Sequence, residues 1–177
     1  RHTRLQGDWS SDVCSSDLVT VDEGGRVTLN ISLRDTGTGF YTILRQVAGE
    51  LLGVAYDEIA METWSTAAIE TDGGVGGARV TNTAGNAIFN ATSQVRDAIA
   101  ETVADRWGVS TDSVSFADGQ VRSGNQVETL AEVMTALGEP VSVQLTHVAE
   151  AATDDTVFTA QAAEVEVDER SEEHTSE

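Results

Sequence analysis

Hydrophobic and polar residues alternate along the segment VTVDEGGRVTLNISLRD, which covers residues 19–35. Successive side chains of a β-strand point to opposite faces of a sheet, so this two-residue period predicts strands with one buried face. The turn Glu23-Gly24-Gly25 divides the segment into two strands. The buried positions of the second strand are expected to be Val27, Leu29, Ile31 and Leu33.

The period becomes helical in TGFYTILRQVAGELLGV, residues 38–54, and again between Val80 and Trp107. Apolar residues spaced three and four positions apart share one side of an α-helix. The first helix is expected to stop at Gly53, because glycine commonly follows a helix end. Its apolar stripe is Ile43, Leu44, Val47, Leu51 and Leu52. The stripe of the second, longer helix is Ala84, Ile88, Ala91, Val95, Ile99 and Val103.

The remaining segments predict short strands, a hairpin and one more helix. DEIAMETWS, residues 57–65, and VSVQLTHV, residues 141–148, are expected to be strands, as is VFTAQAAEVEVD, residues 157–168. Asp118-Gly119 is typical of a tight hairpin turn, and VETLAEVMTALG, residues 127–138, predicts a short amphipathic helix. Helices placed between antiparallel hairpins favour an α+β fold with antiparallel or mixed strands and two main helices over a doubly wound parallel sheet.

Composition and charge narrow the classes of partner. The chain has 177 residues, of which 40% are hydrophobic, enough for one domain with a core. Its formal net charge of −20 repels phosphate backbones and argues against nucleic-acid binding. No apolar run is long enough for a membrane span, and the N-terminus lacks the apolar stretch of a signal peptide, so we expect a cytoplasmic location.

Both ends of the chain are similar to translated DNA-sequencing adapters. RSEEHTSE, residues 170–177, back-translates in frame to a short-read adapter, and residues 1–18 match the adapter of the opposite strand. Within residues 1–18, the three residues LQG do not match the adapter itself, and the gap that they fill has the right length for a six-base index. The alternative is a Ser/Asp-rich linker with an acidic tail. We expect 1–18 and 170–177 to be adapter, which leaves residues 19–169 as the native segment.

This exclusion removes most of the residues that could carry metal or nucleophile chemistry. Cys14, the sole cysteine, lies in the predicted adapter, as do His2 and His174. His147 is then the one native histidine. A zinc site or a cysteine nucleophile therefore has no residues to form it, and the sequence predicts no metal ligand and no catalytic residue within the chain.

Two glycine-bearing loops each directly precede a predicted helix. The first is Asp35-Thr36-Gly37-Thr38-Gly39, and the second runs from Gly73 to Arg79. Glycine allows close approach of the backbone to a ligand, and a helix start offers unpaired N–H groups to an anion. Two such loops could hold a phosphate-bearing cofactor, or they could simply be turns and caps. Neither is a Walker A loop, since the chain has no lysine, and GTGFYT lacks the third glycine of a dinucleotide fingerprint.

Three segments follow one another along the chain: residues 33–54 with DTGTGFYT, residues 73–88 with GGARVT, and residues 157–169 with AEVEVD. Taken together, they resemble the molybdenum-cofactor-binding large subunit of the xanthine dehydrogenase family, which includes aldehyde oxidoreductases and aerobic carbon monoxide dehydrogenase. Residues 33–54, LRDTGTGFYTILRQVAGELLGV, look like its strand–loop–helix unit D-x-G-[QT]-G-x-x-T…Q-[IV]-x-[AG]-E-x-L-G-[IV]. Residues 73–88, GGVGGARVTNTAGNAI, are similar to its segment G-x-x-G-[SA]-R-x-T-x-x-x-G-x-A-[VI]. Residues 157–169 resemble its A-E-V-E-V-D strand. Residues 19–169 are thus identified as a partial molybdenum-cofactor-binding domain.

The resemblance implies a cofactor and the residues that contact it. The cofactor is molybdopterin or its cytosine dinucleotide form, bound largely through backbone and small side chains. Thr38 stands where many members have glutamine, and Ala78 stands where serine is usual. The implied contacts are Thr36, Gly37, Thr38 and Gly39 in the first loop and Gly77, Ala78, Arg79 and Val80 in the second.

The resemblance also implies a reaction and partners. The family transfers oxygen from water into a C–H bond of an aldehyde or N-heterocycle, and electrons pass to 2Fe-2S clusters and FAD on partner domains or subunits, so a hetero-oligomer is expected. The general base is a glutamate in a Gly-x-Gly-Glu segment C-terminal to the A-E-V-E-V-D strand, and this chain does not contain that segment. Glu139, in LGEP, precedes that strand and is not assigned the role. The fragment alone is therefore expected to be inactive; the alternative is a non-enzymatic α+β binding or assembly module.

Overall fold

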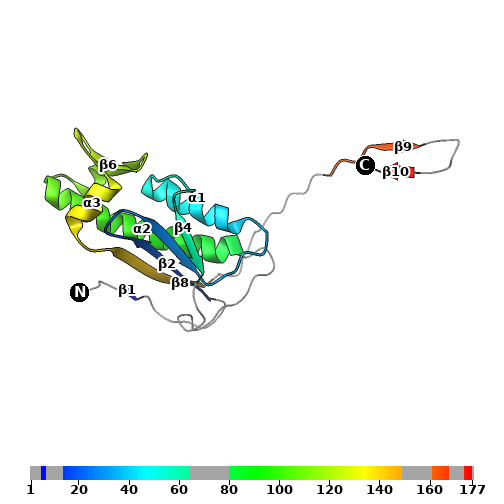
Figure 1. Ribbon diagram of the computed structural model, residues 1–177, viewed down its shortest axis with the longest axis horizontal. Helices are drawn as coiled ribbons and strands as arrows, with labels where there is room; N and C mark the ends of the chain where they lie inside the picture. The colour runs from blue at the N-terminus through cyan, green and yellow to red at the C-terminus, as the bar shows by residue number, and fades with distance from the viewer. Residues whose placement is uncertain (1–4, 7–13, 64–79, 149–160, 168–173, 177) are drawn as a thin grey trace.

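The computed structural model describes residues 5–6, 14–63, 80–148, 161–167 and 174–176, and its centre is a five-stranded mixed sheet (Figure 1). The strand order is β1-β8-β2-β3-β4. Strand β2 pairs antiparallel with β3 and with β8, while β1 runs parallel to β8 and β4 runs parallel to β3. The strands are β1 (Leu5–Gln6), β2 (Cys14–Val21), β3 (Val27–Ile31), β4 (Ala60–Thr63) and β8 (Val141–Val148).

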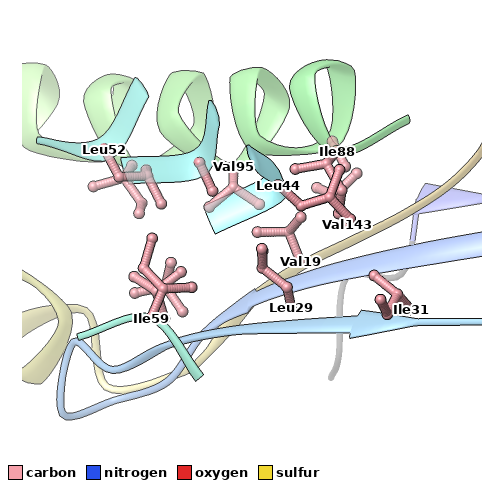
Figure 2. Packing of buried hydrophobic residues seen from close by; sticks show 14 of the residues in the cluster. Val19, Leu29, Ile31, Leu44, Leu52, Ile59, Ile88, Val95 and Val143 are labelled. Carbon is pink, nitrogen blue, oxygen red and sulfur yellow. The ribbon is translucent and has the colours of Figure 1, made fainter. Parts of the chain in front are cut away.

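One face of the sheet is apolar and packs on the helices α1 (Phe40–Leu52) and α2 (Val80–Trp107) (Figure 2). The register aligns Val19 of β2 with Leu29 of β3 and Val143 of β8, and all three side chains are buried. The next residue, Thr20, points to the other face, where its hydroxyl lies 2.9 Å from that of Ser142. The two-residue period therefore separates core from polar face, and the predicted burial at positions 27, 29, 31 and 33 is confirmed.

Helix α1 links β3 to β4, as a parallel pair requires a crossover connection. The predicted apolar stripe of α1 is partly wrong. Ile43 is 38% exposed, whereas Ala48 is fully buried, because the buried side follows four-residue steps. The side chains that face the core are Phe40, Leu44, Ala48 and Leu52.

Helix α2 has the bounds that the sequence predicts. It is 28 residues long and lies beside α1, and all six predicted stripe positions are buried. No helix in the described part of the chain is long and apolar enough to cross a membrane.

A second sheet follows α2 and the 3-10 turn η1 (Thr111–Ser113). Its strands are β5 (Ser115–Ala117), β6 (Gln120–Ser123) and β7 (Gln126–Thr129), paired antiparallel. Asp118 and Gly119 form the predicted tight turn, with φ of 53° and 69°. Two successive positive φ values are the signature of a type I′ hairpin turn.

Helix α3 (Leu130–Leu137) starts later than predicted, because residues 127–129 belong to β7. The reason is a capping box: the Thr129 hydroxyl accepts the Glu132 N–H, and the Glu132 carboxylate accepts the Thr129 N–H. A residue that caps a helix has extended rather than helical backbone, so Thr129 ends the strand and starts the helix. The predicted end at Gly138 is confirmed.

The strand predicted over residues 157–168 is shorter in the structure. Only β9 (Val165–Val167) is a strand among residues 161–167, and residues 149–160 lie outside the described residues. Strand β9 pairs antiparallel with β10 (His174–Ser176), and Figure 1 shows this hairpin standing apart from the other elements. Strand β10, β1 and the first residues of β2 lie within the predicted adapter segments.

Candidate functional site

The first glycine loop, residues 35–39, connects the end of β3 to the start of α1 and is exposed along its whole length. The Asp35 carboxylate accepts the N–H of Gly37 at 2.9 Å, which closes a local turn. Gly37 and Gly39 have φ of 80° and 77°, and a Cβ added to either would meet no atom of the described residues within 4 Å. These glycines are therefore required by their backbone conformation, and the space beside them is open.

The start of α1 faces this open space. Gly39 is the N-cap residue and no side chain caps the helix. The Gly39 carbonyl accepts the N–H groups of Thr42 and Ile43 at 3.1 and 3.4 Å, but the amides of Phe40 and Tyr41, which come before them, have no acceptor within the helix. The first turn also carries no acidic residue. This end of the helix therefore offers N–H donors and the positive end of its dipole to an anion.

Tyr41 holds the beginning of the loop, and the sequence analysis did not single it out. Its hydroxyl donates to the Leu33 carbonyl at 2.9 Å and accepts the Asp35 N–H at 3.1 Å. Its ring lies edge-on to that of Phe40, with centroids 4.7 Å apart. Burial raises the pKa of Tyr41, and the hydrogen bond from the Asp35 backbone opposes this shift. No periodicity marks a tyrosine for this role, since the second residue of a helix can face the loop or the solvent.

Three buried polar side-chain atoms have no hydrogen-bond partner among the described residues: the Thr92 hydroxyl, in the middle of α2, and two atoms on the segments that flank the loop in sequence. Ser32, which directly follows β3, buries its hydroxyl, and Arg45, one turn into α1, buries its Nε. Buried polar groups are normally paired, so unpaired ones are expected where a ligand or another segment completes the structure. Neither residue was predicted from the sequence.

The structure gives the position of the second loop only indirectly, from the start of the helix that follows it. Gly77, Ala78 and Arg79 lie outside the described residues, and Val80 is the buried first residue of α2. Helices α1 and α2 lie side by side and run in the same direction, so that both begin at the same end of the sheet (Figure 1). Leu44 of α1 and Ile88 of α2 both belong to the buried cluster between the helices and the sheet (Figure 2). Of the eight predicted cofactor contacts, the structure thus brings residues 36–39 and Val80 to one end of the fold.

The comparison with known families shows which family the chain belongs to. The molybdopterin cofactor-binding domain family matches residues 4–177. The chain belongs to this family. The matched range includes both predicted adapter segments, so it does not separate them from the rest of the chain. The predicted resemblance is confirmed.

Relatives with known names are much longer than this chain. It is 33% identical over 114 residues to the aldehyde oxidoreductase molybdenum-binding subunit PaoC of Escherichia coli (strain K12), covering 64% of this chain and 15% of PaoC. It is 27% identical over 101 residues to the nicotine 6-hydroxylase large subunit of Paenarthrobacter nicotinovorans, covering 57% of this chain and 12% of that subunit. The chain therefore corresponds to a small part of each relative.

Solved structures show the same fold. Quinoline 2-oxidoreductase from Pseudomonas putida 86 matches with a TM-score of 0.65 at 23% identity, over 76% of this chain and 19% of that chain. The Cu,Mo-CO dehydrogenase matches with a TM-score of 0.62 at 20% identity, over 74% of this chain and 18% of that chain. The predicted α+β class with antiparallel and mixed strands is confirmed.

Proposed function

We propose that this chain is part of the cofactor-binding subunit of a molybdenum hydroxylase that oxidises an aldehyde or an N-heterocycle with oxygen from water. The family match over residues 4–177 carries this proposal. The 33% identity to an aldehyde oxidoreductase subunit supports the substrate class. The open glycine loop at an uncapped helix start supports a ligand rich in oxygen and phosphate at this position.

In this proposal the first loop binds the cofactor through its backbone. Thr36, Thr38 and Gly39 contribute amides and small side chains, while the Gly37 amide already donates to Asp35 and serves the shape of the loop. The start of α1 adds its dipole and its free N–H groups. Gly77, Ala78, Arg79 and Val80 are proposed as the second set of contacts. The bound molybdenum cofactor would supply the redox chemistry, and the protein would position it.

The proposal assigns no catalytic residue to the chain. Glu139 directly follows the left-handed Gly138 that ends α3, and it is exposed. The general base is proposed to lie in a Gly-x-Gly-Glu segment that follows the region of β9 in the complete subunit. The 177-residue chain by itself is then inactive. 2Fe-2S clusters and FAD on partner domains or subunits of a cytoplasmic hetero-oligomer would accept the electrons.

The test starts by recovering the complete gene from the source DNA. Sequencing across residues 18–19 and 169–170 is expected to replace the adapter codons with native coding sequence, and a Gly-x-Gly-Glu codon run is expected downstream. The complete protein, produced with its partner subunits, should oxidise an aldehyde or N-heterocycle with a dye acceptor, while the 177-residue chain should not. A stop codon soon after Glu169 would contradict the proposal and favour a non-enzymatic module.

A further inference from the structure

We propose that Tyr41 is the positioning residue of the cofactor loop: its hydroxyl fixes the loop 35–39 in the conformation that presents the amides of Thr36, Thr38 and Gly39 to a ligand. The part of this inference that concerns the ligand rests on the proposed function. The part that concerns the loop rests on hydrogen bonds within this chain and can be tested without any cofactor.

The Tyr41 hydroxyl joins two points of the backbone that precede the loop. It donates to the Leu33 carbonyl at 2.9 Å and accepts the Asp35 N–H at 3.1 Å. Leu33 is a buried core residue, whereas Asp35 is exposed. The hydroxyl therefore anchors the first residue of an exposed loop to the core and to the first turn of α1 at the same time.

Other hydrogen bonds of the loop stay within it or within the start of the helix. Asp35 accepts the Gly37 N–H at 2.9 Å, and the hydroxyls of Thr36 and Thr38 lie 3.5 Å apart, at the limit of a hydrogen bond. These bonds shape the loop but do not attach it to the sheet. Among the described residues, the Tyr41 hydroxyl makes the side-chain attachment between the loop and the end of β3.

The hydroxyl and the ring of Tyr41 can be separated experimentally. The ring packs edge-on against Phe40, at an angle of 86° between the ring planes. Phenylalanine at position 41 keeps this contact and removes both hydrogen bonds. Tyr56 provides a matched control, because the chain has two tyrosines and the Tyr56 side chain is 49% exposed, after the end of α1.

The first experiment compares Tyr41→Phe with Tyr56→Phe by NMR hydrogen exchange on the 177-residue chain. Losing one hydrogen bond should speed exchange of the Asp35 amide about tenfold relative to the Val95 amide in the centre of α2. The Val95 amide reports global unfolding, so a rise at Asp35 without a rise at Val95 is a local effect and not a loss of global stability. Tyr56→Phe should leave the ratio unchanged. An unchanged ratio in Tyr41→Phe, or the same rise in both variants, would overturn the inference.

A second measurement does not need Tyr41→Phe to fold. In Tyr56→Phe the only remaining phenol is Tyr41, so its ionisation can be followed by absorbance. The charged neighbours are Arg34 and Asp35. Burial raises the pKa of Tyr41, so the midpoint of its ionisation should lie above the ordinary value of a free tyrosine side chain. A midpoint at the ordinary value would contradict a buried Tyr41 hydroxyl.

The role of Tyr41 in cofactor binding is tested by measuring the molybdenum content of the complete protein. Tyr41→Phe should lower molybdenum per subunit several-fold, and Tyr56→Phe should not. A complete wild-type protein without molybdenum would refute the proposed function and leave the exchange result standing. Full molybdenum content in Tyr41→Phe, with wild-type protein loaded, would refute the positioning role alone.

Discussion

The contact between the end of α1 and the β5–β6 turn predicts a large difference between two glycines that look equivalent in the sequence. Gly53 ends α1 and Gly138 ends α3, with left-handed φ of 65° and 74°. A Cβ on Gly138 would meet nothing within 4 Å among the described residues, but one on Gly53 would lie 2.5 Å from the Phe116 carbonyl carbon and 2.6 Å from Ala117 Cα. Both contacts are with backbone, which cannot rotate away.

The magnitudes follow from these two environments. A left-handed alanine costs roughly 1–2 kcal/mol, and the lower entropy of the unfolded alanine chain offsets about 0.4–1 kcal/mol. Gly138→Ala should therefore destabilise the fold by about 1 kcal/mol. Gly53→Ala has the same terms plus overpacking against Phe116 and Ala117, typically about 1–3 kcal/mol, for a total of about 2–4 kcal/mol. The Gly119 N–H bond to the Gly53 carbonyl would also be displaced.

Urea unfolding followed by circular dichroism measures both variants. With a dependence of about 1–3 kcal/mol per molar urea, the midpoint of Gly53→Ala should lie about 1 M below that of Gly138→Ala. Equal midpoints would show that the β5–β6 turn does not pack on the end of α1 as described, and would refute the reasoning.

Two further predictions concern the region where α2, β7 and α3 meet. Glu128 accepts hydrogen bonds from Arg106 and, at 3.2 Å, from the indole of Trp107, so Glu128→Gln should lower the free energy of unfolding by about 0.5–1 kcal/mol, and less in 1 M NaCl. Urea unfolding with and without salt checks this; a loss independent of salt would contradict it. Thr129→Ala removes the cap of α3 and should cost about 0.5–2 kcal/mol. Hydrogen bonds from the backbone and hydroxyl of Thr129 lower the pKa of Glu132. The part of the cap in which the Thr129 hydroxyl donates to the Glu132 carboxylate is therefore present above the ordinary carboxyl value and lost as pH falls through the lowered pKa, whereas the bond from the Glu132 N–H remains. The difference in Tm between wild type and Thr129→Ala should thus shrink in acid, and a constant difference would refute the capping account.

The sequence predicts those features that local periodicity determines. Alternation at residues 19–35 depends only on strand geometry, and it identifies the buried side of β3 correctly. The bounds of α2 follow from a repeat sustained over 28 residues. The side of α1 that is buried depends instead on where α2 and the sheet lie, and so the burial of Ala48 in place of Ile43 could not be deduced from α1 alone.

The predicted site shows the same difference between features that the local sequence determines and features that depend on contacts between elements. Glycine positions and the following helix are visible in the sequence, and the structure adds the left-handed φ of Gly37 and Gly39. Roles that depend on contacts between elements are not visible in the sequence. Tyr41 in the first turn of α1 bonds to Leu33, two residues after β3, and Thr129 caps α3 from the end of β7. Such contacts require the three-dimensional arrangement, whereas motif spacing needs only the order of residues.

Molybdenum content of the complete protein tests the central claim most directly. The variants are Gly39→Ala in the cofactor loop and Gly138→Ala at the end of α3, two left-handed glycines with equally open surroundings among the described residues. Their strain is similar, so a difference between them reports on the loop and not on stability. We predict stoichiometric molybdenum in the wild type and in Gly138→Ala, and a several-fold loss in Gly39→Ala. Equal molybdenum in both variants, or none in the wild type, would contradict the account.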